Sequence, residues 1–296
     1  MNNADRRPPV RAQYVALGSS FAAGIGLGPR APGSPRACRR TINGYPQQLA
    51  RLRGLSLVDR TSSGATTGHV LNGGQFGQGP QLDGLGPETE LVTLTAGGND
   101  VQYVGDLILL AYRARSRLAR VLMRPFWKGA RPAGERDFES LHRNLRAIVD
   151  EAHRRAPQAR ILLVGYPQIV PSTGTCTEMS FGEDEALLMR EVGCRLDAVT
   201  RDAARDSGAH FVDMAPLSAT HVVGSAQPWV TGAPRRGEVP FHPTLEGAKA
   251  TALQVASTIG RMPPNADPTT AVAASTHTIT APEGRSSSAD GARPDA

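Results

Sequence analysis

Four positions far apart in this chain of 296 residues carry the groups that acyl transfer requires. Ser20 follows the apolar run Tyr14–Leu17 and offers a hydroxyl nucleophile, while His242 precedes the last helical pattern and offers a base. Gly64 and Asn99, in loops of small residues, offer hydrogen-bond donors for a developing oxyanion. A serine hydroxyl becomes a good nucleophile only with a base in reach, and the oxyanion needs preorganised donors. Serine and glycine are also common in turns, so the prediction requires a fold that brings the four together.

Five short apolar runs alternate with helical patterns, which predicts a parallel sheet covered by helices on both faces. The expected fold is a three-layer α/β/α doubly wound (flavodoxin-like) domain with a five-stranded parallel sheet. In such folds ligands bind beyond the carboxyl ends of the strands, where Ser20, Gly64 and Asn99 are placed. The predicted strands are Tyr14–Leu17, Leu55–Val58, Glu90–Thr95, Arg160–Gly165 and His210–Met214.

Helical patterns fill most of the remaining sequence up to about Ile259. The pattern at 101–126 mixes apolar residues with several arginines, so two interpretations stand beside each other. A basic amphipathic helix can lie transiently on an anionic membrane surface. We favour a helix packed on the domain with a solvated arginine face. The other predicted helices span Tyr45–Arg53, Phe138–Arg155, Glu183–Ser207 and the segment from Pro243 to about Ile259.

Composition divides the chain into a short polar N-terminus (1–12), a folded domain (13–262) and a C-terminal tail (263–296). The tail has too few large apolar residues to bury a core and is expected to be disordered. The N-terminus lacks the apolar core of a secretory signal, so the chain as written is expected in the cytoplasm. A true start further upstream would make secretion the expectation. No apolar run is long enough for a transmembrane helix.

The net charge of +6 comes almost entirely from arginine, and these arginines are scattered along the chain. Nucleic-acid binding is therefore not expected, because it requires clustered basic residues. The cysteines, Cys38, Cys176 and Cys194, have no metal-ligand spacing, and we expect neither a metal nor a cofactor. Cys176 and Cys194 could pair in an oxidising compartment and would stay reduced in a cytosol.

Four sequence blocks, in order, resemble those of the SGNH hydrolases, also called GDSL esterases and lipases, over about residues 13–260. The loop Ser63-Gly64-Ala65-Thr66-Thr67 and the pair Tyr45-Pro46 are similar to the secreted esterase and lipase branch found in actinobacteria. The blocks are Gly18-Ser19-Ser20 for Gly-Asp-Ser, the loop at 62–67 for the glycine block, Gly97-Gly98-Asn99-Asp100 for Gly-x-Asn-Asp, and Phe241-His242-Pro243 for the histidine block.

This resemblance implies a serine-dependent carboxylic-ester hydrolase, an esterase or lipase, that acts through a Ser20 acyl-enzyme with His242 as base. It also implies an oxyanion hole formed by the backbone N–H groups of Ser20 and Gly64 and the side-chain amide of Asn99. The implied substrate is a small-molecule or lipid ester, and phospholipase and carbohydrate acetylesterase activities stay open. The alternative is a catalytically impaired ligand-binding protein on the same fold.

Two departures from the family pattern keep that alternative open. Ser19 stands where the family has an aspartate beside the nucleophile. Val239 stands where the family often has the acid that orients the histidine, and Glu238 is one residue too early. We therefore predict a Ser20–His242 dyad in which the Val239 backbone carbonyl orients the imidazole, in preference to the Glu238 carboxylate.

The resemblance also bears on Cys38. Secreted family members often pair a cysteine near this position with one just before the serine–glycine loop, where this chain has Ser62. Cys38 is therefore expected to be unpaired, which agrees with the expected location in the cytoplasm.

Overall fold

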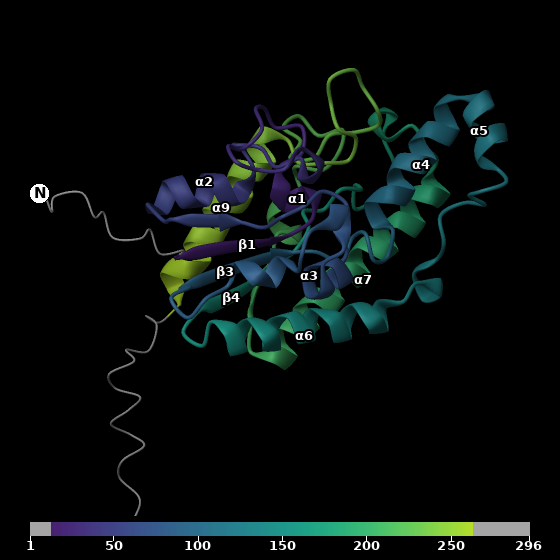
Figure 1. Cartoon of the computed structure of the whole chain (residues 1–296). Helices are drawn as coiled ribbons and strands as arrows, with labels where there is room; N and C mark the ends of the chain where they lie inside the picture. Colours follow the sequence, from purple (N-terminus) through teal and green to yellow (C-terminus); the bar gives the residue numbers. More distant parts are fainter. Residues whose placement is uncertain (1–12, 263–296) are drawn as a thin grey trace, which may run out of the picture. The chain divides into compact units, whose positions relative to one another are not determined.

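The computed structural model describes residues 13–262, so the predictions for 1–12 and 263–296 lie outside the described residues. One parallel sheet runs through the described part in the order β2-β1-β3-β4-β5, which is the flavodoxin-like order (Figure 1). The predicted fold class is confirmed. The strands are β1 (Tyr14–Gly18), β2 (Leu57–Asp59), β3 (Leu91–Thr95), β4 (Arg160–Val164) and β5 (His210–Val212).

The central strands read as unbroken apolar runs because helices cover both of their faces. Successive side chains of a strand point to opposite faces. In β1, Tyr14 and Ala16 join the core under α2 (Tyr45–Arg53) and α9 (Leu245–Arg261). Their neighbours Val15 and Leu17 join the core that includes α6 (Phe138–Arg155) and α7 (Glu183–Ser207). Figure 1 shows α2 and α9 on one side of the sheet and α6 on the other.

The two edge strands differ from their predicted bounds. Strand β2 begins at Leu57 instead of Leu55, and β5 ends at Val212 instead of Met214. An edge strand pairs with a single neighbour, so its ladder ends wherever that neighbour diverges. The remaining short helices are α1 (Ser20–Ala23), α3 (Thr67–Asn72) and α8 (Ala215–Ser218), with 3₁₀ turns at Arg36–Cys38, Gln75–Gly77, Gln81–Gly84, Ala133–Glu135 and Thr177–Met179.

The single helix predicted at 101–126 is two helices, α4 (Tyr103–Arg115) and α5 (Arg117–Met123). Ser116 separates them with extended backbone angles, φ −138° and ψ 120°, and its Oγ accepts a hydrogen bond from Ala119 N at 3.1 Å. Serine competes with the helical backbone in this way, ending one helix and capping the next. Helix α4 packs on the domain as predicted, but none of the residues of α5 is buried.

A buried ion pair fastens α4 to the segment that precedes α6. Arg136 Nη2 lies 2.7 Å from Asp106 Oδ2, and both side chains are almost fully buried. The other carboxylate oxygen of Asp106 accepts a hydrogen bond from Trp127 Nε1 at 3.0 Å. These two contacts hold the segment that follows α5 against the first turns of α4. None of the helices in the described part of the chain is long and apolar enough to span a bilayer.

All three cysteines are free thiols in the structure, so Cys176 and Cys194 are not paired. The Cys176 thiol lies 3.4 Å from the Val223 carbonyl, whereas Cys194 is exposed on α7. Cys38 is buried, and its Sγ accepts a hydrogen bond from Gln78 Nε2 at 2.9 Å.

Candidate active site

The nucleophile turn begins where β1 ends, at Gly18. Its φ of +129° suits glycine, and a Cβ there would lie 2.3 Å from the Thr95 carbonyl oxygen of β3. Ser19 N donates to that same oxygen at 2.9 Å, which holds the turn on the sheet. Ser20 is the first residue of α1, so its N–H points out of the helix start without an intrahelical acceptor.

The side chain of Gln81 holds this turn through both backbone groups of Gly18, and the sequence did not predict this role. Its Oε1 accepts from Gly18 N at 2.7 Å and its Nε2 donates to Gly18 O at 3.1 Å. Ser62 N also donates to Gly18 O, at 2.9 Å. A buried glutamine in a glycine- and proline-rich stretch has no periodicity or motif to identify it, so no sequence signal was available.

The structure brings Ser20 and His242 together, although they are far apart in the sequence. Ser20 Oγ lies 2.8 Å from His242 Nε2. The two residues are only 6% and 7% exposed. His242 Nδ1 lies 2.8 Å from the Pro240 carbonyl, which can only accept, so Nδ1 carries the hydrogen. Nε2 is then the acceptor that faces the serine hydroxyl.

The prediction that the Val239 carbonyl orients the imidazole is wrong. That oxygen accepts a hydrogen bond from Thr231 Oγ1 at 2.6 Å, and the Pro240 carbonyl contacts the imidazole instead. The Glu238 side chain is exposed, and no bond between it and His242 is present among residues 13–262. The chain turns sharply before the histidine, and this turn brings the carbonyl two residues back against Nδ1.

Thr231 and Phe241 hold the histidine in this position. Thr231 Oγ1 accepts from His242 N at 3.1 Å, and Thr231 N donates to His242 O at 2.9 Å. Phe241 is fully buried with φ +54°, a left-handed conformation that is costly for a bulky residue. Such strain persists only where surrounding packing enforces it, and it is concentrated at functional sites.

Burial is the main cause that lowers the pKa of His242 below its ordinary value. The hydrogen bond to the Pro240 carbonyl acts in the opposite direction, and the positive charge of Arg39 adds to the lowering. The imidazole is therefore neutral at neutral pH, which is the form that a general base requires.

The other two residues predicted for the oxyanion hole, Gly64 and Asn99, lie in the loops that follow β2 and β3, and these strands are the two neighbours of β1. Asn99 Nδ2 donates to Ala65 O at 2.7 Å, which joins the loop after β3 to the loop after β2. A side-chain amide has two N–H donors, so the second stays available for a ligand. Gly64 is exposed in that loop with φ +82°, a conformation that suits glycine.

Asp100 anchors the same region without facing the dyad. Its carboxylate accepts hydrogen bonds from Thr67 N at 3.0 and 3.1 Å and from Thr67 Oγ1. Asn144 Nδ2 of α6 donates to Thr67 Oγ1 at 3.0 Å. Asp100 thus fixes the start of α3, next to the loop that carries Gly64.

The Tyr166 hydroxyl lies next to the side chain of Ser19, and the sequence predicted no catalytic role for Tyr166. Its hydroxyl accepts a hydrogen bond from Gly98 N at 3.1 Å and lies 3.4 Å from Ser19 Oγ. Burial raises the pKa of Tyr166 to about 12, so the phenol keeps its proton. The ring packs edge-on against Phe21, with centroids 4.8 Å apart.

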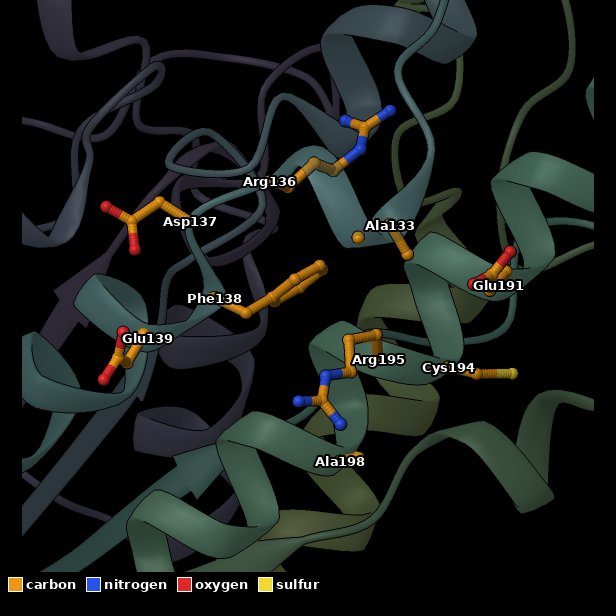
Figure 2. Close-up of a pocket in the computed structure, with 10 residues that line it drawn as sticks. Ala133, Arg136, Asp137, Phe138, Glu139, Glu191, Cys194, Arg195 and Ala198 are labelled. Atoms are coloured by element: carbon orange, nitrogen blue, oxygen red, sulfur yellow. The ribbon is translucent and has the colours of Figure 1, made fainter.

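A cavity of about 700 Å³ lies elsewhere, between the start of α6 and α7 (Figure 2). Figure 2 shows the Phe138 ring directed into it and the Arg136 side chain directed away. None of the predicted site residues lines it, and its one nucleophile, Cys194, has no histidine beside it there. Within residues 13–262, no group of three or more His, Cys, Asp and Glu side chains is arranged to hold a metal ion.

The sequence profile of the GDSL-like Lipase/Acylhydrolase family matches residues 16–250. Lipase 2 of Streptomyces coelicolor is 32% identical over 264 residues, which cover 83% of this chain and 85% of the relative. An extracellular lipase from Streptomyces rimosus matches in structure with a TM-score of 0.66 and 27% identity, over 83% of this chain and 98% of that chain. Phospholipase A1 from Streptomyces albidoflavus gives a TM-score of 0.64 and 28% identity with the same coverage.

The matched span contains all four predicted blocks, and two of these relatives have solved structures with the same fold. The chain therefore belongs to the GDSL-like Lipase/Acylhydrolase family, the SGNH hydrolases, and is an enzyme of the lipase and esterase class.

Proposed function

We propose that this enzyme hydrolyses carboxylic esters through a covalent acyl intermediate on Ser20. The observation that supports this most directly is the 2.8 Å contact between Ser20 Oγ and His242 Nε2 at a site where both residues are buried. A buried hydroxyl aligned with a neutral imidazole is the arrangement that makes serine nucleophilic. A protein that only binds ligands has no need of this pairing.

In the acylation step, Ser20 Oγ attacks the ester carbonyl carbon while its proton moves to His242 Nε2. The Pro240 carbonyl accepts from Nδ1–H and stabilises the imidazolium that forms. The tetrahedral intermediate collapses, the C–O bond to the alcohol breaks, and Nε2 returns the proton to the leaving oxygen. Water then repeats the sequence on the acyl-enzyme and releases the carboxylic acid.

The negative charge on the carbonyl oxygen is stabilised by three donors in this proposal: the N–H groups of Ser20 and Gly64 and the free amide hydrogen of Asn99. The absence of an intrahelical acceptor for Ser20 N and the single bond from Asn99 Nδ2 to Ala65 support this assignment. Loss of one such donor typically lowers kcat by about 10²–10³.

For the substrate we propose an ester of a lipid or fatty acid. The support is the similarity to a lipase of Streptomyces coelicolor and to phospholipase A1 of Streptomyces albidoflavus. The latter favours phospholipids as the second candidate within the same class. Both candidates use the same dyad and differ in the alcohol that leaves.

The test is turnover of p-nitrophenyl esters from acetyl to palmitoyl by the wild type, Ser20→Ala and Ser19→Ala. We expect Ser20→Ala to lose on the order of 10⁴-fold or more in kcat. Ser19→Ala, the matched control on the same turn, should keep activity within about tenfold, because its hydroxyl makes one long contact at 3.4 Å. Equal turnover by wild type and Ser20→Ala would overturn the proposal, and the acyl-chain series identifies the preferred substrate.

A further inference from the structure

Helix α5 and the turn after it expose a set of large apolar side chains that join neither apolar core of the described residues. Leu118, Val121, Leu122 and Phe126 are 67%, 68%, 61% and 91% exposed. The first three are spaced three and four residues apart and share one side of the helix. We call these four residues the α5 face. Exposed apolar groups gathered in this way mark an interaction surface.

Positive charge surrounds the α5 face. From Leu107 to Gly134 the sequence has seven arginines and lysines and no acidic residue, so this segment more than accounts for the net charge of +6. Arg117, Arg120 and Arg124 lie on the side of the helix next to the apolar one, by their spacing. The ion pair from Arg113 to Glu185 at 3.3 Å joins α4 to α7 and does not involve the exposed arginines of α5.

The segment after α5 is held against α4 by Trp127, whereas the apolar side chains of the α5 face stay exposed. Trp127 turns inward, where its Nε1 bonds to Asp106 at 3.0 Å and its ring lies 5.0 Å from the Arg113 guanidinium carbon. The adjacent Phe126 turns outward. Figure 1 shows α5 at the far end of α4, standing away from the sheet.

We propose that the α5 face docks this enzyme onto anionic phospholipid surfaces, with the apolar side chains inserted at the interface and the arginines on lipid phosphates. Amphipathic helices bind such interfaces by combining buried apolar area with attraction to anionic lipids. The inference goes beyond the proposed hydrolysis and does not depend on it.

The charge pattern favours a lipid surface over two other occupants. A second copy of the chain in a symmetric dimer would place the same basic residues against each other, which costs energy. A nucleic acid would neutralise the arginines, but it would leave aliphatic side chains such as Leu118 and Val121 in water. An anionic bilayer surface offers phosphates to the arginines and an apolar interior to the aliphatic side chains.

The α5 face and the candidate site lie at opposite ends of α4. Helix α4 begins soon after Asn99, and its 13 residues span about 20 Å before α5 starts. A cavity of about 480 Å³ beside α5 is lined in part by Arg120 and Phe181. The Phe181 ring lies 6.2 Å from that of Phe241, the neighbour of His242. Docking would therefore place the lipid surface beside this cavity, whose Phe181 packs against the neighbour of the catalytic histidine.

The experiment measures co-flotation with phosphatidylcholine vesicles that contain or lack phosphatidylglycerol. The Ser20→Ala protein serves as parent, so that hydrolysis cannot consume the vesicles. We expect the parent to partition onto the anionic vesicles and to be released between about 0.1 M and about 0.5 M NaCl, because salt screens charge. Loss of the apolar groups should lower partitioning at least tenfold, and loss of three arginines about a hundredfold. The two variants are Leu118→Ser/Leu122→Ser/Phe126→Ser and Arg117→Gln/Arg120→Gln/Arg124→Gln.

Matched controls change exposed leucines and exposed arginines on other helices. Their binding should equal that of the parent. In the otherwise wild-type protein, the α5 variants should hydrolyse soluble p-nitrophenyl acetate at the wild-type rate, which separates failure of docking from failure of the proposed hydrolysis. The controls are Leu52→Ser/Leu187→Ser/Leu253→Ser and Arg143→Gln/Arg154→Gln/Arg205→Gln.

Two results would overturn the proposal. One is equal partitioning of the parent and both α5 variants onto anionic vesicles. The other is a dimer in sedimentation velocity that the apolar α5 variant dissociates, which would assign the face to a second copy of the chain.

Discussion

Ser19 stands where the resemblance to the family places an aspartate, and the Tyr166 hydroxyl is the polar group beside its side chain. The Tyr166 hydroxyl accepts from Gly98 N at 3.1 Å, which secures the loop that leads into Asn99. Its contact with Ser19 Oγ is longer, 3.4 Å, and is weak by hydrogen-bond geometry. The backbone bond to Gly98 is therefore the contact of Tyr166 that we expect to matter.

Tyr166→Phe should leave Gly98 N–H buried without an acceptor, at a cost of about 1–3 kcal/mol in the free energy of unfolding. Because the loop that carries Asn99 loosens, kcat should fall while KM changes less. Urea denaturation and p-nitrophenyl ester kinetics measure the two effects. Ser19→Ala should change both quantities less, and the reverse ranking would show that the Ser19 contact is the important one.

The low pKa of His242 predicts the shape of the pH profile. A general base must be neutral, so kcat/KM should rise with pH through the pKa of His242, with a midpoint below the ordinary value of 6.5. Arg39→Gln removes a positive charge that lowers this pKa, so the midpoint should move to higher pH. The measurement is kcat/KM between about pH 5 and pH 9.

Glu238→Gln is the control for this profile. Its side chain is exposed, and the Pro240 carbonyl orients the imidazole, so kcat and the midpoint should stay nearly unchanged. A loss of about a thousandfold in kcat would instead give Glu238 the role of the triad acid.

At the scale of elements, the loop after β2 and the 3₁₀ turn at Arg36–Cys38 lie against each other. Ser63 N donates to Cys38 O at 3.0 Å. The adjacent Ser62 Oγ is buried and has no hydrogen-bond partner in the described structure. This buried hydroxyl stands where the resemblance described above places a cysteine in secreted family members.

Ser62→Cys should allow a disulfide with Cys38, because the next residue, Ser63, already donates a backbone hydrogen bond to the Cys38 carbonyl. Oxidation should raise the free energy of unfolding by on the order of 3 kcal/mol, and dithiothreitol should abolish the gain. Thermal melts and thiol titration measure this. Ser62→Ala removes the unpaired hydroxyl without a cross-link, so it should show no effect of reductant. Full thiol reactivity in the oxidised variant would show that the two Cα atoms are too far apart.

At the scale of the molecule, a carboxylate pair between α7 and the end of β5 makes stability depend on pH. Burial, followed by the negative charge of Asp213, raises the pKa of Asp197 to about 6. Arg201 contacts both carboxylates at 2.8 Å and opposes this shift only in part. One oxygen of Asp197 is buried without a hydrogen-bond partner in the described residues.

The sign follows from linkage. Between about pH 4 and pH 6, Asp197 keeps its proton in the folded state and loses it in the unfolded state, so stability falls as pH rises through this window. Asp197→Asn should therefore stabilise the protein at pH 7.5 by about 1 kcal/mol, after allowance for partial exposure, and raise Tm by about 2–4 °C. The gain should vanish near pH 4. Asp202→Asn, at a half-exposed position of the same helix, is the control and should leave the pH dependence of stability as in the wild type.

The sequence by itself determined the features that depend on local pattern. Apolar runs buried on both faces identified the strands, and the 3.6-residue stripe of α6 identified that helix with its observed bounds. Four blocks in order identified the family, and they predict Ser20, Gly64, Asn99 and His242 as its site residues.

Only the tertiary structure decided which groups meet across long separations. The orienting carbonyl belongs to Pro240 and not Val239, since the turn geometry before His242 selects it. Gln81 and Tyr166 support the site through contacts with residues at least 63 positions away, which no local pattern records. The exposure of α5 likewise depends on what packs against it, and a helical pattern specifies a face without specifying a neighbour.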